Sequence, residues 1–381
     1  PPRPPRSPLF PYTTLFRSLL DFGIGENDEM APASVRAVMK TQVDQLDNRG
    51  YADNGIARYK QAAAAFMSRT FGVTLDPDTE INHCIGSKTA LAMIPAAFID
   101  PGDVTLMTTP GYPVAGTHTQ YYGGQVHNMP LTADNGFRPD LDAIPDDIRQ
   151  RAKLMVLNYP NSPTGALADE AFFAKVIRFA REHEIVVVHD AAHILLTYGR
   201  KPLSFLAVDG AGDVGVEIHS MSKGYHMIGW RLGCVAGNAR IVRAFADVKD
   251  NSDSGQFMAI QKAGAAALDD DSIPAVVRDK YYRRLQKLVT ALHDVGATVA
   301  MPGGTYFLYV PAPKAANGQP FANAEDACQY LIRQLSICTV PWDNAGPYLR
   351  FSVTYQAPTL ADEDALMAEL KRRLTANKFV W

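Results

Sequence analysis

One stretch of the sequence combines a nucleophile with groups that bind anions: Ser-Met-Ser-Lys-Gly-Tyr-His-Met-Ile-Gly-Trp-Arg, residues 220–231. Its lysine, Lys223, could form an imine with an aldehyde if the surrounding pocket lowered the pKa of its amine. Ser220, Ser222 and Arg231 offer two hydroxyl groups and a guanidinium, which suit a phosphate. The segment is therefore typical of an enzyme that holds a phosphorylated cofactor beside a reactive lysine.

Two upstream features could complete such a site. Asp190 follows the apolar run Ile-Val-Val-Val-His, so we expect its carboxylate at the carboxyl end of a buried strand. A carboxylate there can keep a pyridine nitrogen protonated, which lets the ring accept electrons. Gly86, Ser87 and Lys88 join an expected strand to an expected helix. The backbone N–H groups and positive helix end at such a turn attract a phosphate.

The elements that must position these residues alternate along the chain. From Leu19 onward, short runs rich in Val, Ile and Leu alternate with longer helical patterns, which indicates an α/β fold with a parallel sheet covered by helices. Several runs are apolar throughout, as expected of strands buried on both faces. Each helical pattern begins near a Ser, Asp or Asn suited to capping. The expected strands are 81–85, 103–108, 154–158, 185–189, 216–219 and 232–236, and the expected helices are 87–99, 169–183 and 240–249.

A chain of 381 residues is long enough for two domains. We expect residues 36–265 to form the large domain that contains the sheet, and residues 19–35 and 266–381 to form a smaller α+β domain. The expected elements of the smaller domain are helices at 273–295, 324–334 and 360–374, and strands at 306–310 and 348–353.

Residues 1–18 differ from the rest, since they are rich in Pro and Arg and show no periodicity. From Arg3 to Ser18 they resemble the translation of a sequencing adapter and differ from that translation only at Pro8. We therefore expect a disordered or foreign segment and exclude it from the fold.

Composition excludes several classes of partner. With 47% hydrophobic residues, 20% charged residues and a net charge of -3, the chain has no basic surface that would suit nucleic acid. The four cysteines form no CxxC pair, which argues against a disulfide framework or a thiolate metal site. No apolar run approaches the roughly 18 residues that span a bilayer. We expect a cytoplasmic enzyme that acts on small metabolites.

Two functions from other classes compete with this interpretation. His189 and His193 have the spacing of the zinc-hydrolase motif HExxH, but that motif requires a helix and a glutamate base, whereas His189 closes a strand-like run. We therefore expect no metal site. A non-catalytic regulator of the same fold would carry an added DNA-binding module, and the sequence has no helix-turn-helix pattern.

The order of these motifs resembles that of the class I and II aminotransferases, enzymes of fold type I that use pyridoxal phosphate (PLP). The resemblance implies that Lys223 holds PLP as a Schiff base and moves a proton, while Asp190 pairs with the pyridine nitrogen. It also implies that Tyr112 stacks on the ring and that Arg350 binds the substrate α-carboxylate near Gly25. It assigns the phosphate to Gly86, Ser87, Lys88, Ser220, Ser222, Arg231 and Tyr51. Because Tyr51 would come from a neighbouring subunit, a homodimer with shared active sites is expected.

Three positions depart from the family pattern. The family's Asn-Pro-Thr-Gly is Ser-Pro-Thr-Gly here, so Ser162 replaces the asparagine that contacts the cofactor's phenolic oxygen, unless Asn161 shifts to serve. His193 replaces a tyrosine, and His226 stands where a smaller residue is common. A hydroxyl and an imidazole can still hydrogen-bond a phenolate oxygen. We therefore expect a retuned cofactor and retained activity.

Residues 21–29, 50–55 and 339–350 resemble LL-diaminopimelate aminotransferases, which exchange an amino group with 2-oxoglutarate on the route to lysine. By this resemblance Asp53 and Asn54 of the partner subunit would face the distal end of the substrate, and Lys88 its distal carboxylate. A broad aspartate, alanine or aromatic aminotransferase is the main alternative within the family, and a C–S lyase is a more distant one.

Overall fold

The computed structural model describes residues 19–381, which form two compact units. The larger unit comprises residues 26–283 and 302–308, and the smaller unit comprises residues 19–25, 284–301 and 309–381. The boundaries that the sequence analysis puts at 35/36 and 265/266 thus lie at 25/26 and 283/284, the second of them inside helix α12 (Ser272–His293). A continuous helix gives no break in sequence pattern that could mark it. The interpretation of residues 1–18 as foreign lies outside the described residues.

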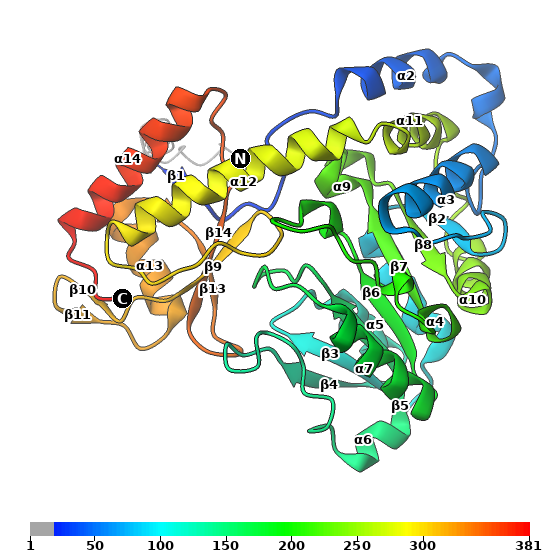
Figure 1. Ribbon diagram of the computed structural model, residues 1–381, viewed down its shortest axis with the longest axis horizontal. Helices are drawn as coiled ribbons and strands as arrows, with labels where there is room; N and C mark the ends of the chain where they lie inside the picture. Colours follow the sequence, from blue (N-terminus) through cyan, green and yellow to red (C-terminus); the bar gives the residue numbers. More distant parts are fainter. Residues whose placement is uncertain (1–18) are drawn as a thin grey trace, which may run out of the picture. The chain divides into compact units, whose positions relative to one another are not determined.

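A seven-stranded sheet forms the core of the larger unit (Figure 1). Its spatial order is β2-β8-β7-β6-β5-β3-β4, and only β8 runs against the other strands. The expectation of a mostly parallel sheet is therefore confirmed. The strands are β2 (Ile81–Cys84), β3 (Val104–Thr109), β4 (Gln125–Pro130), β5 (Ala152–Asn158), β6 (Val186–Asp190), β7 (Gly215–Ser220) and β8 (Gly233–Gly237).

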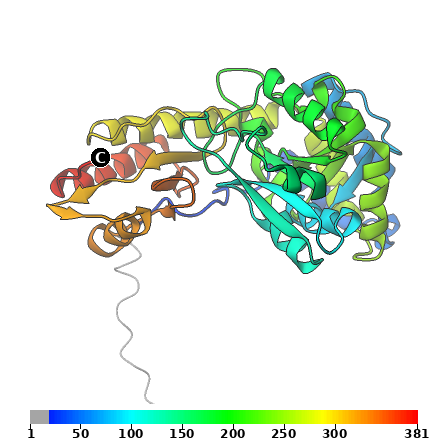
Figure 2. The same cartoon turned by 90° about the horizontal axis from the view of Figure 1, so that it is seen from below.

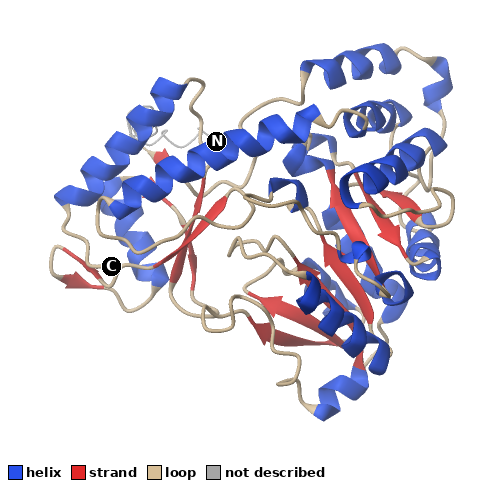
Figure 3. Ribbon diagram, viewed as in Figure 1, coloured by secondary structure: helices blue, strands red, loops and turns tan. Residues whose placement is uncertain are grey.

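Helices cover both faces of this sheet (Figures 2 and 3). Besides part of α12, the helices of the larger unit are α2 (Ala33–Val43), α3 (Ala57–Phe71), α4 (Ser87–Phe98), α5 (Val114–Tyr121), α6 (Asp146–Arg151), α7 (Glu170–Glu182), α8 (Ala211–Val214), α9 (Met221–Gly224), α10 (Ala239–Asp250) and α11 (Met258–Leu268). Short 3-10 helices occupy Leu46–Arg49, Ile194–Leu196, Phe205–Ala207 and Ile228–Trp230.

Successive residues of a central strand enter different cores, as the pleat of a strand requires. In β5, Leu154 packs in the cluster that contains Leu91 of α4. The next residue, Met155, packs in the cluster that contains Phe173 of α7. The candidate site residues lie at or just after the carboxyl ends of these strands.

The smaller unit is built around a three-stranded sheet in the order β13-β14-β9. Its strands are β9 (Phe307–Pro311, which begins in the larger unit), β13 (Val340–Trp342) and β14 (Tyr348–Ser352). Two short pairs join β1 (Leu20–Asp21) to β12 (Ile337–Cys338) and β10 (Ala315–Ala316) to β11 (Gln319–Pro320). Its helices are α13 (Ala324–Leu335), α14 (Leu360–Ala376) and the remainder of α12.

The expected strands and helices occur within one or two residues of their predicted bounds, but the prediction lacks several elements, among them helices α2, α3, α5 and α11. Strand β4 is absent from the prediction, because this edge strand is mostly exposed and its sequence Gln-Val-His-Asn-Met-Pro has no apolar run. Helix α4 has Gly86 as its N-cap, without a side-chain hydrogen bond, so Ser87 does not cap it. The first turn of α4 therefore keeps N–H groups that no side chain caps.

None of the helices among residues 19–381 combines the length and the apolar character that crossing a membrane would require.

Candidate active site

Lys223 lies on the short helix α9, directly after β7. Ser220 caps this helix, since its hydroxyl accepts a hydrogen bond from Ser222 N at 3.2 Å. The Lys223 amine lies 5.2 Å from the centroid of the Tyr306 ring, within range of a cation–π contact. Strand and cap together fix the amine at the carboxyl edge of the sheet.

Asp190 ends β6, the parallel neighbour of β7, and is 5% exposed. Burial raises the pKa of its carboxyl group, while a hydrogen bond from Ala192 N and the positive charges of His189 and Lys223 act in the opposite direction. A buried carboxylate with these partners can hold a proton on a cationic ring nitrogen by direct pairing. The structure therefore brings Asp190 and Lys223 to the same edge of the sheet.

A cradle for an anion forms where α4 begins. Gly86 has a φ of +78°, and a Cβ at this position would overlap the guanidinium of Arg231. Arg231 also donates to Ser222 Oγ at 3.2 Å and to Ile228 O at 2.8 Å. The start of α4, the guanidinium and the Ser222 hydroxyl thus converge, and only glycine leaves room for the arginine. Such a set fits the phosphate of PLP.

The other residues assigned to the phosphate differ in how far they are exposed. Ser87 is half-buried in the first turn of α4, whereas the next side chain, Lys88, is exposed. Tyr51 has 82% of its surface exposed. Within one chain, Tyr51 therefore contributes to no buried site.

Tyr112 lies in the loop that follows β3 and is 42% exposed. Burial raises the pKa of its hydroxyl, the charge of Asp190 raises it further, and the charge of Arg231 lowers it. Tyr112 is thus within electrostatic reach of both residues. A partly exposed aromatic ring near the carboxylate and the guanidinium is suitable for stacking on a flat cofactor.

The turn after β5 supplies a free donor. Asn161 is fully buried, and its Oδ1 accepts from Thr164 N and Thr164 Oγ1 at 3.2 and 2.7 Å. Its Nδ2 atom has no hydrogen-bond partner among the described residues. Ser162 donates its main-chain N–H to Asn158 Oδ1 at 2.7 Å. The orphaned amide of Asn161 is the kind of buried group that a bound oxygen would satisfy.

The two unusual histidines have aromatic neighbours. His193 is 5% exposed and lies edge-on to Tyr306, with ring centroids 5.2 Å apart. His226 stacks on Tyr281 with an interplanar angle of 11°, and burial lowers the pKa of its imidazole. Both rings are therefore packed into the larger unit.

Sequence reasoning missed residues that reach Lys223 from distant parts of the chain. Asn27 Nδ2 donates to Lys223 O at 3.1 Å. The following residues are anchored as well, because Lys280 Nζ lies 2.8 Å from Asp28 and 2.6 Å from Glu29. Tyr306 lines the lysine from another segment. Asn27, Asp28 and Glu29 lie in the stretch 21–29 that carries a family resemblance, and Tyr306 begins an expected strand, but neither pattern indicated a contact with Lys223.

The candidate residues for the distal end of the substrate lie next to α10. Lys249, whose side chain is buried, donates to the main-chain oxygen of Asp53 and pairs with Asp253 at 2.6 Å. Asn54 uses both ends of its amide within the chain, since it donates to Asp250 at 2.6 Å and accepts from Asn82 at 2.7 Å. The Asp53 side chain is exposed, so of this pair it is the one better placed to meet a ligand.

In the smaller unit, Arg350 lies on β14 and donates from Nη2 to Gly23 O at 2.8 Å. The segment before Gly25 is held by Ser352 N, which donates to Phe22 O at 2.7 Å, and by Thr354 Oγ1, which donates to Ile24 O at 2.8 Å. Arg350 and the turn that contains Gly25 are therefore brought together, as the sequence analysis expected.

The zinc-hydrolase hypothesis has no support from the geometry. His189 lies on strand β6, and its Nδ1 is 2.8 Å from Glu217 Oε2. Among residues 19–381, no group of three or more His, Cys, Asp or Glu side chains is arranged to hold a metal ion.

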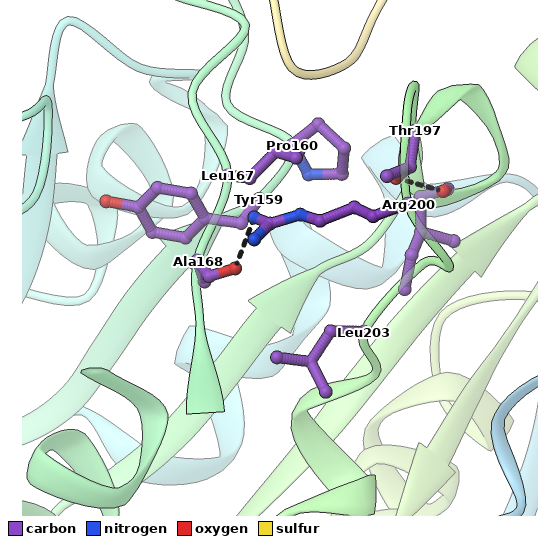
Figure 4. Close-up of a pocket in the computed structure, with 8 residues that line it drawn as sticks. Tyr159, Pro160, Leu167, Ala168, Thr197, Arg200 and Leu203 are labelled. Atoms are coloured by element: carbon purple, nitrogen blue, oxygen red, sulfur yellow. Dashed lines mark hydrogen bonds between the residues drawn. The ribbon is translucent and has the colours of Figure 1, made fainter. Parts of the chain in front are cut away.

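A separate pocket opens beside the end of β5 (Figure 4). Arg200 crosses it and donates to Ala168 O at 3.0 Å. Its volume is about 20 Å³, enough for about one water molecule. The pocket is therefore too small for a metabolite and does not compete with the site around Lys223.

The chain is similar to known proteins in both sequence and fold. The family model described as aminotransferase class I and II matches residues 17–361. The LL-diaminopimelate aminotransferase of Methanocaldococcus jannaschii is 53% identical over 365 residues, which cover 93% of this chain and 87% of that protein. The enzyme of the same name from Methanococcus maripaludis is 51% identical over 370 residues, which cover 95% and 89%. The solved structure of substrate-bound BacF from Bacillus subtilis has a TM-score of 0.87 at 29% identity and covers 96% of this chain and 95% of that chain.

Proposed function

Because the chain belongs to the class I and II aminotransferases, we propose that it transfers an amino group between LL-diaminopimelate and 2-oxoglutarate, in the biosynthesis of lysine. The chain is a PLP-dependent enzyme, as this family is. The choice of substrate is supported by the two relatives of that name described above, which are similar to this chain over nearly its whole length.

One structural observation supports the chemistry: Lys223, Asp190 and the Gly86–Arg231 cradle share one edge of the sheet. When bound, PLP supplies an electron sink for the carbanion that forms at the substrate Cα. Lys223 Nζ binds the cofactor and moves the proton at the substrate Cα. Asp190 holds the proton on the pyridine nitrogen, so that the ring stays cationic.

The remaining residues bind and orient. We assign the phosphate to the N–H groups of residues 86–88 and to the side chains of Ser87, Ser220, Ser222 and Arg231. Tyr112 stacks on the ring. Asn161 Nδ2 is better suited to donate to the phenolic oxygen than the Ser162 hydroxyl, because the amide is buried and has no partner among the described residues. We also assign the His193 imidazole to the phenolic oxygen, which an imidazole can hydrogen-bond.

The substrate contacts follow the family assignment. Arg350, beside the turn at Gly25, takes the α-carboxylate through its planar guanidinium. Asp53 of a partner subunit pairs with the distal ammonium, with Asn54 beside it, and Lys88 attracts the distal carboxylate. Tyr51 of the same partner reaches the phosphate. These assignments require a homodimer, because one chain alone would lack the distal pocket.

Exposed apolar side chains support the homodimer. Met30, Leu46 and Tyr51 expose 72%, 75% and 82% of their surfaces within one chain. Apolar side chains exposed together in one part of a chain are typical of an interface. We also propose a cytoplasmic location, which is supported by four cysteines that are all free thiols.

Substrate profiling tests the proposal. Purified PLP-loaded enzyme is given 2-oxoglutarate with LL-diaminopimelate, aspartate, alanine or phenylalanine, and glutamate formation is measured. We expect the highest kcat/KM with LL-diaminopimelate and no turnover by Lys223→Ala. A higher kcat/KM with aspartate, alanine or phenylalanine would replace the proposal with the broad-specificity alternative. Release of a thiol from a cysteine conjugate without glutamate formation would identify a C–S lyase.

A further inference from the structure

Strand β7 buries a carboxylate that the proposed reaction does not use. Glu217 is 0% exposed. Its Oε1 accepts hydrogen bonds from Ser204 Oγ at 2.9 Å and His219 Nε2 at 2.7 Å. Its Oε2 accepts from His189 Nδ1 and Phe205 N, both at 2.8 Å. Two donors on each oxygen fill the accepting capacity of an ionised carboxylate.

These donors determine the protonation state of the group. Burial alone would raise the pKa of Glu217, but the charge of His219 and the hydrogen bonds from His189 and His219 hold that pKa well below its ordinary range. A protonated carboxyl group would place an O–H against donors that need an acceptor. Glu217 is therefore a carboxylate in the folded chain.

His189 connects this carboxylate to the end of β5. Glu217 and His189 are direct partners in the register of β6 and β7. The opposite ring nitrogen of His189, Nε2, lies 3.0 Å from Tyr159 O and 3.3 Å from Tyr159 N. Because Nδ1 is fixed as a donor to Glu217, the orientation of the ring and its contact with the Tyr159 backbone are fixed too.

The residue before Tyr159 makes the link to the cofactor site. Asn158 donates from Nδ2 to Asp190 O at 2.8 Å and accepts at Oδ1 from Ser162 N at 2.7 Å. The backbone positions of Asp190 and of the Asn161–Ser162 turn therefore depend on where the end of β5 lies. His189 holds that end through Tyr159.

We propose that Glu217 is a positioning residue for the cofactor site: its carboxylate orients His189, which holds the ends of β5 and β6 from which Asp190 and the Asn161–Ser162 turn reach PLP. The inference rests on the proposed function, since it uses the roles assigned there to Asp190 and Asn161. Glu217 itself touches neither cofactor nor substrate in this scheme.

Glu217→Gln tests the proposal, because the amide has nearly the same shape but places an NH₂ group against two donors. We expect the Kd of the apoprotein for PLP, measured by absorbance titration, to rise about tenfold, as for the loss of hydrogen bonds to a charged group. We also expect a shift in the pH midpoint of the visible absorbance of the Lys223-bound cofactor. A purely structural role would leave this midpoint in place.

Glu363→Gln is the matched control. Glu363 is a second buried glutamate, 2% exposed, and it pairs with the buried Arg284 at 2.8 Å in the smaller unit. We expect this variant to lower the melting temperature without changing the PLP affinity or the absorbance midpoint.

A second variant covers the case in which Glu217→Gln fails to fold. Ser204→Ala keeps the charge of Glu217 and removes one donor, and it should change the Kd and the midpoint in the same direction by a smaller amount. Glu217→Gln is the deciding variant if it folds, and Ser204→Ala is if it does not. The proposal is overturned if the deciding variant keeps the parent Kd and absorbance midpoint while its melting temperature falls. PLP titration uses no amino donor, so an error in the assigned substrate would leave this result valid.

Discussion

At the scale of single residues, the sheet fixes the relation between the carboxylate and the amine. Asp190 pairs with Ile218 in the register of β6 and β7, and Ala191 N continues the ladder by donating to Ile218 O at 3.0 Å. Neighbouring strands keep a spacing of about 4.8 Å. Asp190 and Lys223 are thus positioned by the most rigid part of the larger unit.

Replacement of Asp190 by asparagine should separate binding from chemistry. Asp190→Asn keeps the shape but removes the negative charge that, in the proposed mechanism, holds a proton on the pyridine nitrogen. We expect kcat to fall about 10²-fold or more, as for the loss of a preorganised electrostatic contact, while Lys223 still binds PLP. Steady-state kinetics and visible absorbance measure the two effects.

The matched control for this change is Asp213→Asn. Asp213 makes an exposed ion pair with Arg181 at 2.9 Å, and its loss should change kcat by less than about twofold. Equal kcat in Asp190→Asn and the parent enzyme would show that the pyridine nitrogen has another partner.

At the scale of elements, the junction between β2 and α4 admits only one residue type. Gly86 combines a positive φ with the close approach of Arg231. Gly72, the C-cap of α3, has a similar φ of +73°, but a Cβ there would meet no atom within 4 Å. Substitution of the two glycines in parallel therefore distinguishes the effect of backbone strain, which both share, from the effect of displacing Arg231, which occurs only at Gly86.

Gly86→Ala should weaken PLP binding by at least about tenfold, because Arg231 must leave the cradle, in addition to a backbone cost of roughly 1 kcal/mol. Gly72→Ala should have only the backbone cost, so we expect a lower melting temperature and an unchanged PLP affinity. Absorbance titration of each apoprotein gives the comparison. Similar PLP affinities in the two variants would exclude the proposed role of Arg231.

Strand β2 also gives the protein a pH dependence. Burial lowers the pKa of His83 from 6.5 to about 4. Below pH 6.5 the unfolded chain therefore protonates His83, whereas the folded chain does so only near pH 4. The stability that neutral His83 allows is thus fully present above pH 6.5 and is lost as the pH falls toward 4. The loss is roughly 3 kcal/mol over this range.

His83→Gln should reduce this loss, because glutamine does not titrate and can still hydrogen-bond Gln256, which lies 3.0 Å from His83 Nε2. Urea unfolding at pH 7 and pH 4.5 measures the free energy of unfolding of both proteins. If the parent and the variant lost the same free energy between these values, His83 would not be the responsible group.

The elements also show how far sequence reasoning reaches. Asp190, Lys223 and residues 86–88 were predictable, because each directly follows a short apolar strand whose carboxyl end must lie at one edge of the sheet. The contacts of Asn27 and Tyr306 with Lys223 were not predictable, since they are tertiary contacts that neither the resemblance of residues 21–29 nor the expected strand at 306–310 encodes. The orphaned amide of Asn161 depends on a turn geometry that composition does not reveal.

At the scale of the whole molecule, the proposed homodimer makes the active site depend on a second copy of the chain. Leu46 and Tyr51 are exposed in a region that also carries Asp53, one of the residues assigned to the distal pocket. A homodimer interface would explain both the exposure of Leu46 and Tyr51 in one chain and the proposed shared site. Loss of the interface should therefore remove activity along with the dimer.

Leu46→Asp should dissociate the dimer, because a charge would be buried at the interface without a partner. Sedimentation velocity should show a monomer whose circular dichroism matches that of the parent and whose kcat/KM for LL-diaminopimelate is lower by at least about tenfold. Leu360→Asp is the control, since Leu360 is 57% exposed at the start of α14 in the smaller unit. A Leu46→Asp protein that remained dimeric and active would place the interface elsewhere.

The pairing of β2 with β8 has a consequence for the order in which the protein is made. Residues 81–84 leave the ribosome early, but their hydrogen-bonding partners are residues 233–236. Long-range pairing of this kind cannot begin before both strands exist. Arg231, which the Gly86 cradle needs, lies two residues before the start of β8. A nascent chain that stops before residue 231 therefore cannot build this cradle, and under the proposed assignment the cofactor can enter only when most of the larger unit has been synthesised.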